Sequence, residues 1–241
     1  MTNGVFNNSM LVAYERATGA VKKRVYFNSG YVPLGGHVGG LAIDGDNLYV
    51  VSNRKTGHTL TIYSLLEILS ANNGSHITPK LPVQRLDAAS YAGAYAGQLF
   101  VGDFESSLMY VYRLAADGSV ITPSIGHYVT PPQTQGVVVN QRTITYSTSH
   151  GRNNASTLAT YTRDLHQYVS GMAIPNMAEG LTWIPMFYKN EWVNAAAVIF
   201  ESGARYYRGY YEESKHSTKP ENTASCIQTQ VHALPESIMG M

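Results

Sequence analysis

The sequence predicts an all-β chain, folded as a β-propeller of five blades whose fifth blade is reduced or closed by the chain termini. Three observations predict this class. Short apolar segments alternate with turn residues, long helical patterns are absent, and a fixed order of segments recurs along the chain. A β-sandwich is the alternative that the same strand pattern would fit, and the regular spacing of the repeat favours the propeller.

The repeat consists of a small-residue turn, an apolar strand, a second apolar strand that ends in polar residues, a third strand rich in tyrosine in most copies, and a fourth strand. Gly40, Gly93, Gly136 and Gly180 mark its four copies, which are separated by 53, 43 and 44 residues. A four-stranded propeller blade takes about 40 to 50 residues. The glycines predict crowded inner strands, where neighbouring backbones come close together and side chains must be small.

We expect one domain, residues 1–241, with four repeat blades at residues 34–88, 89–131, 132–175 and 176–241. Residues 1–33 are expected to supply outer strands of the closing blade, completed by residues 4–7 or by the C-terminal tail. Residues 64–72 have helical spacing and predict a turn or two of helix between strands.

Composition argues against several functional classes. The 241 residues carry a formal net charge of +1, and 14% of them are charged, so no strong field attracts nucleic acid or an acidic membrane. No run approaches the roughly 18 apolar residues of a membrane helix. The single cysteine, Cys226, excludes an internal disulfide. We expect a soluble monomer, exported after loss of a signal peptide that this sequence does not contain.

A family resemblance supports the fold. The strings GHVGGLAI, TQGVVV with STSHGRNNAS, and AEGLTW with FESGARYYR resemble secreted actinobacterial β-propeller proteins, most of which have no assigned activity. The resemblance covers residues 36 to 210. It implies a propeller fold and an export route, and it implies no reaction.

Polar residues converge at one predicted end of the strands. The first strand of a blade starts on the side where the antiparallel second strand ends, so residues from both places should lie together at the channel mouth. Those from the starts of first strands are His37, Tyr91, Gln135 and Glu179. Those from the ends of second strands are Asn53, Asp103, Glu105, Ser149, His150, Arg152 and Glu201.

Each group has a possible chemistry and a simpler structural reading. Glu179 and Glu201 could divide acid and base roles or accept bonds from nearby backbone amides. His150, in STSHGRNN, offers a titratable ring beside the cation of Arg152, or is an ordinary loop histidine. Asp103 and Glu105 could hold Ca²⁺ through carboxylate oxygens or form a solvated loop. The eight histidines show no zinc spacing, and no other cofactor is expected.

Three functions follow as hypotheses. The first is binding of a small polar or sugar-like ligand at the channel mouth by His37, Asn53, Tyr91, Asp103, Gln135, Ser149 and Arg152. The second is a hydrolase or lyase in which Glu179, Glu201 and His150 are catalytic. The third is a scaffold that binds protein through its rim. The sequence favours the first.

Overall fold

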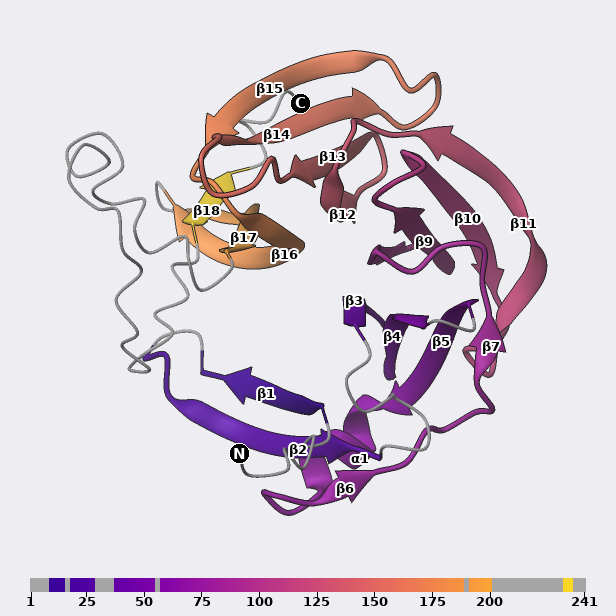
Figure 1. Cartoon of the computed structure of the whole chain (residues 1–241). Helices are drawn as coiled ribbons and strands as arrows, with labels where there is room; N and C mark the ends of the chain where they lie inside the picture. Colours follow the sequence, from indigo (N-terminus) through magenta and orange to yellow (C-terminus); the bar gives the residue numbers. More distant parts are fainter. Residues whose placement is uncertain are drawn as a thin grey trace, which may run out of the picture. The chain divides into compact units, whose positions relative to one another are not determined.

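A computed structural model describes residues 9–15, 18–28, 37–54, 57–188, 191–200 and 232–235. These residues are nearly all in β-strands, which form three four-stranded and two three-stranded sheets (Figure 1). The chain divides into two compact units. Unit 1 comprises residues 1–103 and 108–128, and unit 2 comprises residues 104–107 and 129–241. The all-β class is confirmed, whereas the count of five propeller blades stays a prediction.

Sheet B, in unit 1, contains β3 (His37–Asp44), β4 (Asn47–Arg54), β5 (Gly57–Ser64) and β7 (Gln84–Arg85) in that order. Its strands are antiparallel. Gly45, with φ of 56°, forms the tight turn between β3 and β4. Sheet B therefore has the meander order of a propeller blade.

Sheet C repeats this order with β8 (Tyr91–Tyr95), β9 (Gln98–Asp103), β10 (Leu108–Leu114) and β11 (Val120–Val129). Tyr112 of β10 ties sheet C to the segment that precedes β8. The hydroxyl of the buried Tyr112 donates to Asp87 Oδ2 at 2.7 Å and accepts from the Asp87 amide at 2.9 Å. Burial, followed by the bond to Asp87, raises the pKa of Tyr112.

Sheets B and C pack through one apolar core. Tyr49, Val51 and Ile62 of sheet B meet Leu99 and Val101 of sheet C. The predicted glycine packing is confirmed for β3, because a Cβ on Gly39 would overlap the carbonyl oxygen of Ala89 and one on Gly40 would lie 2.6 Å from the amide of Ala92.

The structure corrects the glycine alignment for the second repeat. Gly40 pairs with Val51, and the residue that pairs at the same place in sheet C is Tyr91, opposite Gly102. Gly93 lies two residues further along β8. The large side chain of Tyr91 fits because its partner on β9 is Gly102, which has no side chain. A Cβ on Gly102 would overlap the tyrosine ring.

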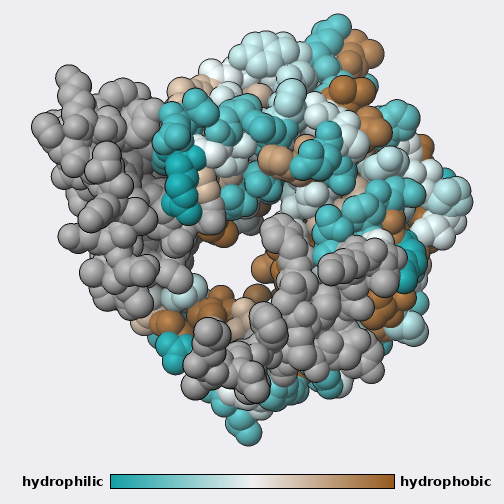
Figure 2. Space-filling model, viewed as in Figure 1, coloured by the Kyte–Doolittle hydropathy of each residue, from teal (hydrophilic) through white to brown (hydrophobic). Residues whose placement is uncertain are grey.

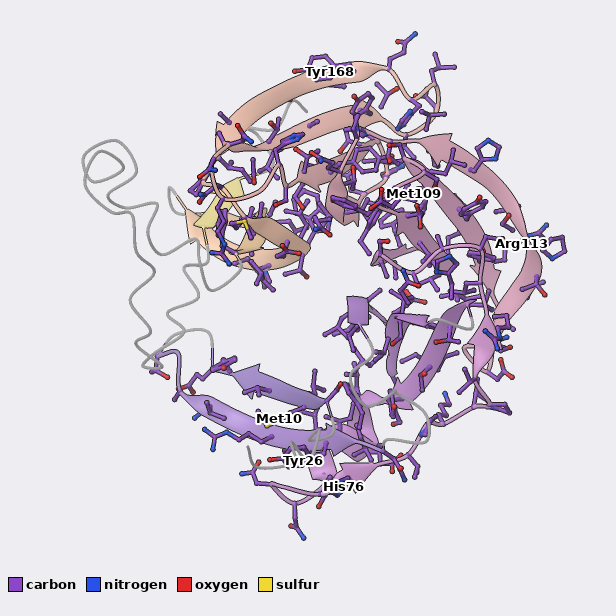
Figure 3. The ribbon with its side chains drawn as sticks, viewed as in Figure 1. Met10, Tyr26, His76, Met109, Arg113 and Tyr168 are labelled. Carbon is purple, nitrogen blue, oxygen red and sulfur yellow. The ribbon has the colours of Figure 1, made fainter. Side chains whose placement is uncertain are left out.

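Sheet A contains the N-terminal hairpin, β1 (Met10–Tyr14) and β2 (Val21–Phe27), and the short parallel strand β6 (His76–Ile77). Figure 3 shows Tyr26 and His76 together where β2 meets β6, and their rings stack with centroids 5.4 Å apart. The third strand thus comes from residues 76–77. The sequence predicts residues 4–7, which lie outside the described residues, or the C-terminal tail in this place.

The predicted helical turn is confirmed as α1 (Leu65–Ser70). Ser64 caps it by accepting from the Glu67 amide at 3.2 Å, and Asp46 Oδ1 accepts from the Leu66 amide at 2.8 Å. The hydrogen bond from Ser64 lowers the pKa of Asp46, with a smaller effect from Leu66. Ile68 of the helix packs into the core between sheets A and B.

In unit 2, sheet D contains β12 (Thr134–Val139), β13 (Thr143–Thr148), β14 (Ser156–Thr162) and β15 (Tyr168–Ile174) in meander order. Sheet E contains β16 (Ala178–Tyr188), β17 (Glu191–Phe200) and β18 (His232–Pro235). β18 pairs directly with β17, so it is the third strand of sheet E in the described residues.

Sheets D and E pack through β12 and β16. Val138 and Leu158 of sheet D meet Leu181, Ala196 and Val198 of sheet E. The indole Nε1 of Trp183 also donates to the Val139 carbonyl at 3.2 Å. These contacts hold β12 against β16, and the candidate site lies at the starts of these two strands.

The described surface carries no single apolar face in the view of Figure 2, which shows hydrophobic atoms in separate patches among hydrophilic ones. Several apolar side chains lie on edge strands. One of them is Tyr168 of β15, which is 63% exposed and is labelled in Figure 3. Among the described residues, no helix is long and apolar enough to span a membrane.

Candidate functional site

The two inner strands of unit 2 begin with the same irregular backbone. Gln133 and Met177, one residue before β12 and β16, have φ of 58° and 61°. Each strand then has a bulge, between Thr134 and Gly136 in β12 and between Ala178 and Leu181 in β16. Left-handed residues other than glycine are strained and persist where the surroundings hold them, and bulges redirect side chains. The bulges contain the predicted site residues Gln135 and Glu179.

Close packing joins these two strand starts. A Cβ on Gly136 would lie 2.6 Å from the Glu179 carbonyl oxygen and 2.7 Å from Ser147 Oγ. The Ser147 hydroxyl donates to that same carbonyl at 3.0 Å. The structure therefore brings Gln135 and Glu179 to neighbouring strand starts. Gly180 differs from the prediction, because a Cβ there would be 3.7 Å from its nearest contact, Ile199 Cδ1.

His150 lies beside these starts, and both of its ring nitrogens bond to the protein. Nδ1 bonds to Gln133 Oε1, and Nε2 lies 3.2 Å from Thr148 Oγ1. A carboxamide oxygen only accepts, so Nδ1 donates to Gln133, and the Thr148 hydroxyl is the partner of Nε2. The Ser149 amide also donates to the Gln133 carbonyl at 3.0 Å. The ring is thus held in place and half-buried.

Two asparagines fix the loop that follows His150. Asn154 Nδ2 donates to the His150 carbonyl at 2.9 Å, and Asn176 Nδ2 donates to the Arg152 carbonyl. Asn176 is 5% exposed, and its Oδ1 has no hydrogen-bond partner. If the Asn176 amide were flipped, Oδ1 would face the Arg152 carbonyl oxygen, and two acceptors cannot form a hydrogen bond. The orientation is therefore fixed, and Oδ1 has no partner.

We call Gln133, Gln135, His150, Asn176 and Glu179 the entry cluster. Four members belong to PPQTQG and PNMAEG, the two strings that precede and open β12 and β16. Asn176 was missed by the sequence analysis. The only available signal was its place in a string that matches PPQTQG, because one asparagine in a loop has no periodicity.

The other predicted residues of unit 2 have varied surroundings. Ser149 is buried and contributes its backbone amide, as described above. Arg152 is exposed on the loop that Asn176 holds. Glu105 is exposed in the turn between β9 and β10. Glu201 lies outside the described residues.

In unit 1, His37 and Asn53 are directly opposite each other at the start of β3 and the end of β4. Asn53 is exposed, whereas Tyr91 is 1% exposed and belongs to the core. Asp103 ends β9 and is half-buried. Among the described residues, no group of three or more histidine, cysteine, aspartate or glutamate side chains could hold a metal ion. The Ca²⁺ site at Asp103 and Glu105 stays a prediction.

An aromatic cluster lies at the other end of sheet D. His166, in the turn between β14 and β15, stacks on Tyr161 with centroids 4.7 Å apart, and its Nε2 lies 2.9 Å from the hydroxyl of Tyr146. Burial lowers the pKa of His166 and raises that of Tyr161. This cluster stabilises the turn and is separate from the entry cluster.

Comparison with known proteins gives similarity of fold. No protein-family model and no curated protein matches the chain. Among solved structures, it is similar to the glutaminyl cyclase of Myxococcus xanthus, with 12% identity over 77% of this chain and 78% of that chain and a TM-score of 0.46. It is also similar to a chain of a nidogen/laminin complex, with 17% identity over 80% of this chain and 70% of that chain and a TM-score of 0.47.

A third similar structure is the WD40 domain of Toxoplasma gondii coronin, with 13% identity over 69% of this chain and 43% of that chain and a TM-score of 0.42. All three are β-propeller-type proteins. The likeness concerns the backbone alone. Kinship with secreted actinobacterial propellers stays a prediction.

Proposed function

We propose that the chain binds a small, neutral, hydroxyl-rich ligand, such as a sugar, at the entry cluster. The observation that carries this proposal is Asn176 Oδ1. A buried acceptor without a partner costs about 1 to 3 kcal/mol, and a ligand hydroxyl that donates to it recovers this cost. The Asn176 side chain is held by the Arg152 carbonyl, and because Oδ1 is buried, a ligand has to displace neighbouring groups to reach it.

The surrounding groups support binding more than acid–base catalysis. Both nitrogens of His150 are engaged by Gln133 and Thr148, which suits a positioning role and leaves no ring nitrogen ready to take a proton from a substrate. Gln135 and Glu179 add amide and carboxylate groups at the adjacent bulges. Such mixed donors and acceptors match the hydroxyl groups of a sugar.

Asn176→Leu tests this function. Leucine fills a similar volume and removes the unpaired acceptor together with one hydrogen bond, so we expect the free energy of unfolding to change by less than about 1 kcal/mol. A thermal-shift screen with neutral mono- and disaccharides and polyols comes first. A ligand at about 100 times its Kd stabilises the native protein by about 2.7 kcal/mol. The variant should lose that stabilisation.

Asn140→Leu is the matched control. Asn140 lies just after β12, at its other end, and its Oδ1 accepts from the amides of Arg142 and Thr143 at 2.8 and 2.7 Å. We expect this variant to be less stable and to keep the full ligand-induced shift. Equal loss of the shift in both variants, or no shift with any sugar or polyol, contradicts the proposal.

A further inference from the structure

The loop between β13 and β14 lies beside Asn176. Seven residues, 149–155, separate these two strands, whereas four residues, 104–107, separate β9 from β10 at the same place in sheet C. Residues 151–154 are exposed, and we call residues 151–155 the entry loop. Surface loops are more mobile than the strands that they connect. The entry loop is therefore a part of the candidate site that can move with little effect on the core.

Two asparagine side chains hold the entry loop closed. Asn154 Nδ2 donates to the His150 carbonyl at 2.9 Å, which closes the loop upon itself. Asn176 Nδ2 donates to the Arg152 carbonyl, which ties the loop to the segment before β16. Asn154 is exposed, so water competes for its bond, and local opening of such a segment costs much less than global unfolding. The loop can therefore open while sheets D and E stay folded.

Gly151 gives the entry loop a hinge. Its φ of 80° lies in the left-handed region, which glycine adopts without strain. Beyond its two chain neighbours, no heavy atom lies within 4 Å of where its Cβ would be. No close packing therefore resists rotation of the backbone there, and hinges are loop residues that absorb such rotations. Movement about Gly151 carries the Arg152 carbonyl away from Asn176.

The entry loop is one of the groups that bury Asn176 Oδ1. Asn176 is 5% exposed, and its nitrogen and oxygen share one carbon, so a loop bonded to Nδ2 lies next to Oδ1. The following residues, Met177 and Ala178, belong to the apolar core of sheets D and E and cannot move without disturbing it. A ligand from solvent therefore reaches the buried oxygen most easily by displacing the loop.

We propose that the entry loop is a gate of the entry cluster. It moves about Gly151, the bond from Asn176 to the Arg152 carbonyl breaks, and the carboxamide of Asn176 is exposed to solvent. The open state then offers Nδ2 as a donor and Oδ1 as an acceptor to the hydroxyl groups of one ligand. Because the closed loop competes with the ligand for Asn176, the apparent affinity depends on the fraction of molecules that are open. This inference rests on the proposed binding of a hydroxyl-rich ligand.

Limited proteolysis with trypsin measures opening of the loop without any ligand. Trypsin cuts after Arg152 only when the surrounding chain has opened, and at a low trypsin concentration the rate follows the population of the open loop. We expect this cut to be at least tenfold slower in the full chain than in a peptide of residues 147–156. Asn154→Ala and Asn176→Leu should each accelerate it roughly fivefold, since each removes one bond that holds the loop.

Asn140→Leu is the matched control. Asn140 accepts from the amide of the exposed Arg142, in the turn at the other end of sheet D. This variant should accelerate the cut after Arg142 and leave the cut after Arg152 unchanged. Mass spectrometry of the fragments distinguishes the two cuts.

Three outcomes overturn the gate. These are an unchanged rate after Arg152 in Asn154→Ala, an equal acceleration there in Asn140→Leu, and a full chain that is cut as fast as the peptide. Asn154 is exposed, so its variant serves if Asn176→Leu fails to fold. No ligand is present, so these rates test the gate alone, whereas the thermal-shift screen tests sugar binding.

Discussion

Strand β3 of unit 1 and strands β12 and β16 of unit 2 each have a bulge near their first residues, but the residues at the bulge differ between the two units. In unit 1, β3 uses Gly39 at the bulge, and its glycines pack directly against the backbone of residues 89–92. In unit 2, the corresponding bulges of β12 and β16 contain Gln135 and Glu179, and Ser147 ties the two strands together. The bulge is therefore shared by β3, β12 and β16 and is absent from β8, and among these strands only the two of unit 2 place polar side chains at it.

This difference shows where a function can be added to a repeated fold. A glycine at the bulge gives close packing and offers no side chain, whereas a polar residue there is redirected by the bulge without disturbing the core. Asn176, whose Oδ1 has no hydrogen-bond partner, lies in the unit with polar bulges, beside the left-handed Met177. An acceptor without a partner, Asn176 Oδ1, thus lies next to a strained backbone at Met177, and strained residues are common at functional sites.

The largest expected effect comes from Gly39→Ala. The added Cβ would overlap the Ala89 carbonyl, which is backbone and yields only if a strand moves, so we expect a loss of about 3 kcal/mol in the free energy of unfolding. Gly180→Ala is the matched control in β16. Its nearest contact would be 3.7 Å away, so the change should stay within about 0.5 kcal/mol. Urea denaturation measures both, and equal losses would mean that the two strand starts are packed alike.

A smaller effect is expected from two buried serines in comparable strands. Ser147→Ala removes the bond to the Glu179 carbonyl and should cost about 1 to 2 kcal/mol. Ser52, 1% exposed in β4, has an Oγ without a hydrogen-bond partner, so Ser52→Ala should be neutral or slightly stabilising. The same denaturation experiment compares them. A cost for Ser52→Ala equal to that for Ser147→Ala would contradict the assigned contacts.

The local sequence pattern was enough to predict where the strands lie, but it did not predict which strands pair with each other. The alternation of apolar residues located β4, β9 and β13, and turn residues located their ends. The two-residue β6 was missed because its parallel pairing with β2 depends on tertiary contacts.

Some residues of the candidate site could not be predicted, because their roles also depend on tertiary contacts. Gln135, His150 and Glu179 were found because they follow or open predicted strands. His37 and Asn53 were named for the same reason, and they do pair across β3 and β4. Asn176 was missed because its proposed role depends on an Oδ1 atom that is buried without a hydrogen-bond partner, and this is visible only in the folded structure.

The smallest expected effect is a pH dependence at the far end of sheet D. Burial lowers the pKa of His166, so protonating it costs more in the folded protein than in the unfolded chain. Its contribution to stability is therefore complete above the ordinary histidine pKa of about 6.5 and is lost as the pH falls through the lowered value. Urea midpoints should decline between pH 7 and pH 5.

His166→Asn identifies the source of that decline. Asparagine tolerates the left-handed φ of 52° at this position and does not titrate, so the variant should be less sensitive to acid. His127→Asn, which alters an exposed histidine in β11, should keep the full decline. If His166→Asn declines as steeply as the unaltered chain, the acid-sensitive group lies elsewhere, and the stacking of His166 on Tyr161 serves only to hold the turn.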